Sequence, residues 1–238
     1  NWACLYCQVE NLSRGGPPPI DLLRLENELN AFLDDVLNGE FLRHHVPADA
    51  RRLVDVAFSG NGEPTSAAEF EAAVVAVARI LGLFGLKGSL PVRLITNGSL
   101  LHRSDVQNGI RHIAALGGEV WFKIDRALDA EVTEINGIPG NQAKVLANLR
   151  SCVALAPTWV QTCWFRLDGM PPTAKSRNAY CALLSEVADK LAGVHLYGLA
   201  RPSQQLAAPR LSAISPDELS TFGQQIEKET GIRVIVSP

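Results

Sequence analysis

The sequence has no long hydrophobic run and no strong excess of either charge, and each absence excludes a class of protein. No apolar stretch reaches the roughly 20 residues that a membrane-spanning helix needs, and no basic segment leads into an apolar one as in a secretory signal. We therefore expect a soluble, cytoplasmic protein without a membrane partner. The net charge is −3 and the pI about 6.0, so no general positive field attracts nucleic acid or anionic lipid.

Cysteines are few as well: the 238 residues include five, at positions 4, 7, 152, 163 and 181. An odd number spread over a chain of this length argues against a disulfide framework, and thiols that stay reduced suit metal binding. The chain also lacks a linker, a repeat or a low-complexity tract. We therefore expect one large domain.

Helical and extended segments alternate along the chain. Hydrophobic spacing and end signals predict helices over 20–38, 66–81, 103–116, 141–156, 174–192 and 216–230, the second of them begun by a capping box of Ser66 and Glu69. Short apolar runs predict strands over 53–60, 92–98, 119–125, 158–167, 194–199 and 232–236. Such alternation needs crossover connections, which give a parallel sheet covered by helices, either flat or curled. In both forms the functional loops lie beyond the carboxyl ends of the strands.

Polar and glycine residues gather at these predicted strand ends, in SGNGEPT (59–65), TNGS (96–99), KIDRA (123–127) and GLARPS (198–203). The period of two in FKID puts Lys123 and Asp125 on one face, either as a polar site or as an ion pair that plugs the barrel end. The two glycines of SGNGEPT let the backbone approach a ligand, and Glu63 offers a carboxylate to an ammonium group or a metal. Taken alone, that loop is a common turn.

Cys4 and Cys7 form a C-x-x-C pair near the start of the chain. Such a pair is half a zinc site, a thiol–disulfide redox pair or part of an iron–sulfur cluster. A zinc site needs a second pair of ligands at similar spacing, which neither the other cysteines nor His44 and His45 supply. A redox pair normally opens a helix within a smaller βαβ domain. The residues therefore favour the iron–sulfur cluster.

In combination these motifs resemble the radical S-adenosylmethionine (radical SAM) superfamily. NWACLYC is similar to the C-x-x-x-C-x-aromatic-C loop that holds a 4Fe-4S cluster in that family, FSGNGEPT to its G-G-E-P segment, LITNGS to its T-N-G strand and FKID to its S-x-D strand. The variant of this segment with Asn61 between the glycines is similar to the branch of the family that contains the tRNA wybutosine-forming enzymes. The resemblance is strongest over 1–136.

The resemblance implies a partial (β/α)6 TIM-type barrel, with parallel strands and outer helices. It also implies that the first strand and the first cluster cysteine lie before Asn1. Residues 1–238 would then be a single radical SAM core domain, cut from a longer chain.

The same resemblance implies the chemistry and the residues that carry it. Cys4 and Cys7 would bind the cluster and leave one iron for the amino and carboxylate groups of S-adenosylmethionine (SAM). Cleavage of SAM would give a 5′-deoxyadenosyl radical, which abstracts hydrogen from an unknown substrate. The cofactor contacts that the resemblance implies are Tyr6, Gly60, Asn61, Gly62, Glu63, Thr96, Asn97, Lys123, Asp125, Gln161 and Arg201.

Partners and alternatives follow from the same comparison. The resemblance implies an external electron donor of flavodoxin or ferredoxin type, and its wybutosine-like loop suggests an RNA substrate, which the acidic total disfavours. Cys163 either points into the barrel or packs in the core, and the basic segment 43–52 is a surface turn or a phosphate contact. The alternative function is a non-catalytic barrel that binds a nucleotide or a partner protein, or an iron–sulfur electron-transfer domain.

Overall fold

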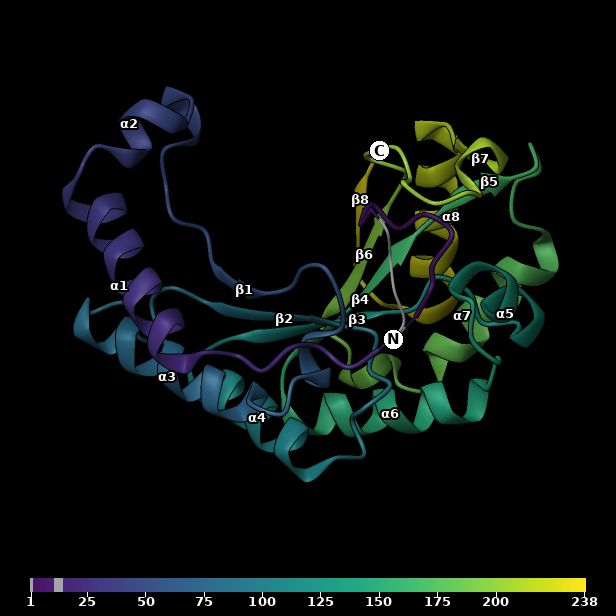
Figure 1. Ribbon diagram of the computed structural model, residues 1–238. Helices are drawn as coiled ribbons and strands as arrows, with labels where there is room; N and C mark the ends of the chain where they lie inside the picture. Colours follow the sequence, from purple (N-terminus) through teal and green to yellow (C-terminus); the bar gives the residue numbers. More distant parts are fainter. Residues whose placement is uncertain (1, 11–14) are drawn as a thin grey trace.

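Six parallel strands form the central sheet of the protein. The computed structural model in Figure 1 describes residues 2–10 and 15–238. The sheet has the order β1-β2-β3-β4-β6-β8, with strands β1 (Val56–Phe58), β2 (Val92–Thr96), β3 (Glu119–Lys123), β4 (Thr158–Cys163), β6 (Gly193–Tyr197) and β8 (Val234–Ser237). Each neighbouring pair is parallel. The predicted α/β fold, a partial TIM-type barrel with outer helices, is confirmed.

The helices of the described residues are α1 (Leu22–Asn38), α2 (Phe41–His45), α3 (Phe70–Leu83), α4 (Ser104–Ala115), α5 (Asp129–Asn136), α6 (Gln142–Leu155), α7 (Ala174–Ser185) and α8 (Pro216–Thr230). Helices such as α3, α4 and α6 cover the convex face of the sheet, whereas α2 lies apart from the sheet, beyond the end of α1 (Figure 1). Short 3-10 turns span Ala48–Ala50, Pro64–Ser66, Ala188–Lys190 and Ala208–Arg210. No helix in the described ranges is long and apolar enough to cross a membrane.

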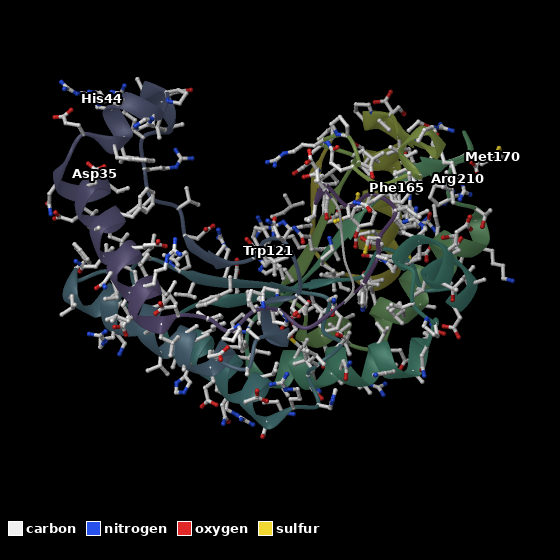
Figure 2. The ribbon with its side chains drawn as sticks, viewed as in Figure 1. Asp35, His44, Trp121, Phe165, Met170 and Arg210 are labelled. Carbon is white, nitrogen blue, oxygen red and sulfur yellow. The ribbon has the colours of Figure 1, made fainter. Side chains whose placement is uncertain are left out.

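The alternating pattern of the strands decides which side chains reach which face. Leu94 of β2 and Val120 of β3 are fully buried under the helices, where they pack in the main core with Ile110 of α4. The alternate residues of each strand point to the opposite face, as Figure 2 shows for Trp121 of β3 on the concave side. Lys123, two positions further along β3, therefore shares that face at the carboxyl end of its strand.

Side-chain N-caps begin four of the eight α-helices in the described residues, namely α1, α6, α7 and α8. Ser215 and Glu218 form the complete capping box of α8, and Gly231 ends that helix in a left-handed conformation, so the predicted range 216–230 is confirmed. The predicted box at Ser66 is wrong, because α3 begins only at Phe70. The Ser66 hydroxyl instead donates to the Glu63 carbonyl oxygen and closes the 3-10 turn that Glu63 begins.

Several other boundaries differ from the prediction; the strand predicted over 53–60, for example, spans only Val56–Phe58. The predicted strand 158–167 divides at Trp164, because β5 (Phe165–Leu167) leaves the main sheet and pairs antiparallel with β7 (Leu211–Ala213). The predicted helix 174–192 ends at Ser185. The sequence did not predict α2 or α5, which are only 5 and 8 residues long.

Gly98, in the loop after β2, has a backbone that only glycine accommodates. Its φ is 68°, and an added Cβ would lie 2.1 Å from the ring of Phe122. We expect Gly98→Ala to lower the free energy of unfolding by more than about 2 kcal/mol in chemical denaturation, because it adds both strain and a clash in the core. Gly85→Ala is the matched control, since its φ is 67° but nothing lies within 4 Å of the added Cβ. Equal losses in the two variants would contradict the clash.

Candidate cofactor site

The segment that carries Cys4 and Cys7 lies across the carboxyl ends of the strands (Figure 1). The N–H of Ala3 donates to the Asn136 carbonyl oxygen at 3.0 Å, and the N–H of Leu5 donates to the Ile135 carbonyl oxygen at 2.8 Å. The segment 2–10, which we call the cysteine loop, is therefore fixed to the end of α5.

Residues that follow β6 hold the other side of the cysteine loop. The N–H of Gln204 donates to the Cys7 carbonyl oxygen at 2.9 Å, and the Ser203 hydroxyl donates to the Leu5 carbonyl oxygen at 2.6 Å. The Gln205 side chain donates to the Val9 carbonyl oxygen at 2.8 Å. Because hydrogen bonds hold the loop on both sides, its two thiols have defined positions.

A cavity of about 210 Å³ opens beside the thiols. Both Cys4 and Cys7 are partly exposed, as ligands of a metal cluster must be. The cavity is lined by Trp2, Cys4, Tyr6, Cys7, Val9, Gly60, Asn61, Gly62, Glu63, Ile95, Asn97 and Lys123. The structure thus brings together the cysteine loop, the GNGE loop after β1 and the TNG loop after β2.

A second cavity of about 510 Å³ adjoins the first, since the two share Tyr6, Cys7, Val9, Gly60, Asn61 and Lys123. It is also lined by two of the predicted residues, Gln161 and Arg201. Cys163 and Tyr197 contribute to the same wall. Most of the residues predicted for the site therefore line one of two adjoining cavities.

Glu63 connects the GNGE loop to the TNG loop. Its Oε1 accepts from the Thr65 N–H at 3.2 Å, from the Thr65 hydroxyl at 2.6 Å and from the Thr96 hydroxyl at 2.5 Å. Its Oε2 accepts from the Asn97 N–H at 2.8 Å. Only 7% of Glu63 is exposed and 1% of Thr96, so this carboxylate holds the cavity wall together from within.

Asp125 lies behind the cysteine loop rather than on the wall of either cavity, and only 2% of it is exposed. Its Oδ2 accepts from the Tyr6 hydroxyl at 2.5 Å and from the Asn136 side-chain amide at 3.1 Å. Its Oδ1 accepts from the Cys163 N–H at 3.0 Å. The carboxylate thus joins the cysteine loop to β4 and to α5.

Burial and this carboxylate together keep protons on the neighbouring groups. Burial, and then the negative charge of Asp125, raise the pKa of the Cys4 thiol to about 11 and raise the pKa of Tyr6 well above its usual value. For Lys123, burial is the largest single influence and lowers the pKa, but the combined charges of Asp125, Tyr197, Cys4 and Cys163 outweigh it, so the net pKa is raised. The Lys123 ammonium donates to the Tyr197 hydroxyl at 3.3 Å and lies 5.0 Å from the centre of the Tyr6 ring.

The thiols of Cys4 and Cys7 are suited to be ligands of an iron–sulfur cluster. Among the described residues, no three His, Cys, Asp or Glu side chains are grouped so that they could hold a metal. Two thiols are present, however, and each accepts an amide hydrogen bond: Cys4 Sγ from the Asn136 side chain at 3.3 Å and Cys7 Sγ from the Val9 N–H at 3.5 Å. Hydrogen bonds to sulfur of this kind are typical of cluster thiolates.

The other sequence predictions near the site have mixed outcomes. Cys152 and Cys181 are buried in the core, away from the site. Cys163 is 2% exposed and also borders the larger cavity, so both interpretations of it describe part of its position. His44 lies far from both cavities on the exposed helix α2 (Figure 2), and the Arg51 guanidinium closes the following turn by donating to the carbonyl oxygens of Arg43 and Val46.

The sequence analysis missed Tyr197 and Asn136. Tyr197 ends β6 and pairs in register with Cys163, so its place at a predicted strand end was the available signal. Asn136 is a buried polar residue directly before a glycine, and it lies on α5, which was not predicted.

Asp125→Asn is expected to loosen the cysteine loop. The Oδ2 atom of Asp125 accepts from both Tyr6 and Asn136, and a neutral amide is a weaker acceptor than the carboxylate. We expect amide hydrogen exchange at Ala3 and Leu5 to accelerate at least tenfold, as measured by mass spectrometry or NMR. The control is Asp129→Asn, at an exposed carboxylate that accepts from the Gln142 N–H. Unchanged exchange at Ala3 and Leu5 would contradict the role given to Asp125.

Three solved structures share this arrangement of elements. A domain of pyruvate-formate lyase-activating enzyme from Bacteroides vulgatus matches with a TM-score of 0.55 and 16% identity, over 78% of this chain and 99% of that domain. Streptococcus suis SuiB bound to S-adenosylmethionine matches with a TM-score of 0.60 and 9% identity, over 99% of this chain and 44% of that one. A radical SAM methyltransferase from Sphaerobacter thermophilus matches with a TM-score of 0.60 and 18% identity, over 89% and 57% of the two chains.

These likenesses bear on the fold. This chain spans about half the length of SuiB and of the methyltransferase. No family model matches the sequence, and no curated protein matches it either. The three structural matches agree with the resemblance in the sequence motifs. The chain has the fold of the radical SAM enzymes.

Proposed function

We propose that this chain is a radical SAM enzyme, with residues 1–238 forming its single core domain within a longer protein. One observation carries the proposal: the cysteine loop, the GNGE loop and the TNG loop are far apart in the sequence and line one cavity at the strand ends. Each of the three loops contributes the kind of group that a cluster or SAM requires.

In this proposal Cys4 and Cys7 provide two of the three thiolates that hold a 4Fe-4S cluster in this family. When bound, the cluster supplies the electron that cleaves SAM to a 5′-deoxyadenosyl radical, which takes hydrogen from a substrate. The residues of the protein would bind and orient SAM and the substrate, and would exclude water from them.

The GNGE loop is suited to bind the amino group of SAM. Gly60 has a φ of 135°, and nothing lies within 4 Å of the position of a Cβ there, so a ligand can approach its backbone closely. In the proposal the Lys123 ammonium faces an anionic group of the cofactor, and the Tyr197 hydroxyl orients it. Tyr6, Gln161 and Arg201 complete the walls.

We also propose that an external flavodoxin- or ferredoxin-type protein delivers the electron. A cytoplasmic location suits five cysteines that are all free in the structure. The net charge of −3 disfavours RNA as a ligand of this domain alone.

The test uses the full-length protein, reconstituted with iron and sulfide without oxygen and then supplied with SAM and a low-potential reductant. We expect about four irons per chain and release of 5′-deoxyadenosine, measured by liquid chromatography and mass spectrometry. A protein that binds the cluster but releases no 5′-deoxyadenosine would favour the electron-transfer alternative and overturn the proposal.

A further inference from the structure

Asn136 contacts the cysteine loop from behind, and none of the roles proposed above includes it. It is the last residue of α5, and only 2% of it is exposed. It borders neither of the two cavities beside the thiols, so it contacts no molecule that occupies them. Its contacts therefore concern the protein side of the cluster site.

The Asn136 side-chain nitrogen has two partners, Cys4 Sγ at 3.3 Å and Asp125 Oδ2 at 3.1 Å. Both partners are acceptors, so each receives one of the two amide hydrogens. The opposite orientation would turn the amide oxygen toward a carboxylate and a sulfur atom, which is repulsive. The chemistry of its neighbours thus fixes the amide as a donor to Cys4.

The backbone holds this contact in place. The Asn136 carbonyl oxygen accepts from the Ala3 N–H, and the Ile135 carbonyl oxygen accepts from the Leu5 N–H, on either side of Cys4. Asp125, itself held by the Tyr6 hydroxyl and the Cys163 N–H, fixes the far side of the amide. The hydrogen bond to Sγ is therefore pre-organised rather than incidental.

We propose that Asn136 is a positioning residue that raises the reduction potential of the cluster through its hydrogen bond to the Cys4 thiolate; this inference rests on the proposed function. Reduction adds one negative charge to the cluster. A donor aimed at a ligand sulfur stabilises the reduced state more than the oxidised one, which is how hydrogen bonds to sulfur set such potentials. Within the described residues, Cys7 Sγ accepts from the backbone N–H of Val9 at 3.5 Å, which no side-chain substitution removes, whereas the Asn136 amide can be removed.

The test compares the full-length wild-type protein with Asn136→Leu, both reconstituted with iron and sulfide. Leucine is similar in size to asparagine and has no N–H to donate. A redox titration followed by electron paramagnetic resonance gives the midpoint potential. We expect the equilibrium constant for one-electron reduction to fall about tenfold in the variant, which is a potential about 59 mV lower.

The matched control is Asn178→Leu, the same substitution on the outer helix α7, where the side chain accepts from Gln225. We expect it to leave the potential unchanged. Equal potentials in the wild type and Asn136→Leu, with the cluster present in both, would overturn this inference and leave the proposed function intact. A wild-type protein that takes up no cluster would overturn both.

A second measurement applies if Asn136→Leu takes up no iron. Wild-type protein labelled with 15N in its asparagine side chains can be examined by pulsed electron paramagnetic resonance of the reduced cluster. An amide nitrogen 3.3 Å from a ligand sulfur should give a weak 15N coupling. Absence of any coupling would overturn the inference without the need for a variant.

Discussion

Glu63→Gln is expected to lower both the stability of the protein and its affinity for SAM. The carboxylate accepts four hydrogen bonds, from Thr65, Thr96 and Asn97. The new NH2 group of glutamine must face at least one of these donors, and the buried negative charge is lost. Hydrogen bonds to charged groups contribute about 1.5–3 kcal/mol each, so we expect a loss of about 3 kcal/mol in the free energy of unfolding.

That loss corresponds to a melting temperature lower by about 6–12 °C for a domain of this size. SAM binding, measured by equilibrium dialysis with the reconstituted protein, should weaken at least tenfold because the GNGE and TNG loops are no longer joined. Glu69→Gln is the control in the same stretch, since the one hydrogen bond that the Glu69 carboxylate accepts within the described residues is a long one, from the Ile20 N–H at 3.3 Å. A melting temperature within 2 °C of the wild type for Glu63→Gln would contradict the role given to this carboxylate.

Cys4→Ser and Cys7→Ser should each abolish cleavage of SAM while the fold is kept. Both side chains are partly exposed, so the substitutions remove little core packing. The loss of a thiolate ligand should instead reduce iron uptake to well under half of the wild-type value and remove the brown absorbance of the cluster. Colorimetric iron and sulfide assays, together with circular dichroism, separate loss of the cluster from loss of the fold.

Cys152→Ala is the control for these two variants. Cys152 is fully buried in the core, where burial raises the pKa of its thiol to about 12, and the Thr158 hydroxyl contacts it. This variant should lose stability by about 1 kcal/mol but should bind as much iron as the wild type. Full iron binding by Cys4→Ser or Cys7→Ser would remove these cysteines from the proposed cluster.

Periodicity within the sequence was sufficient to predict the sheet. The alternation in β2 and β3 is local, and the apolar helices that follow each strand need a sheet to pack against. The motifs after the strands could also be found, because parallel strands bring their carboxyl ends to one edge. For this reason the sequence alone predicts that the TNG and GNGE loops lie at the same edge of the sheet.

The parts that could not be predicted depend on contacts between distant residues. Asn136 meets Cys4 across 132 positions, and α5 has only two buried aliphatic residues, Val132 and Ile135, from which to predict a helix. The departure of β5 from the main sheet depends on pairing with β7, more than 40 positions away. In neither case does a window of 10 or 20 residues contain the partner.

The two-sided attachment of the cysteine loop sets the order in which the molecule can mature. During synthesis Cys4 and Cys7 leave the ribosome long before the groups that hold them, at 135–136 and 203–205. The thiols therefore have no fixed geometry on a nascent chain. Under the proposed function, a cluster would meet both thiols in their final geometry only after most of the domain has been synthesised, so we expect its insertion to be a late step.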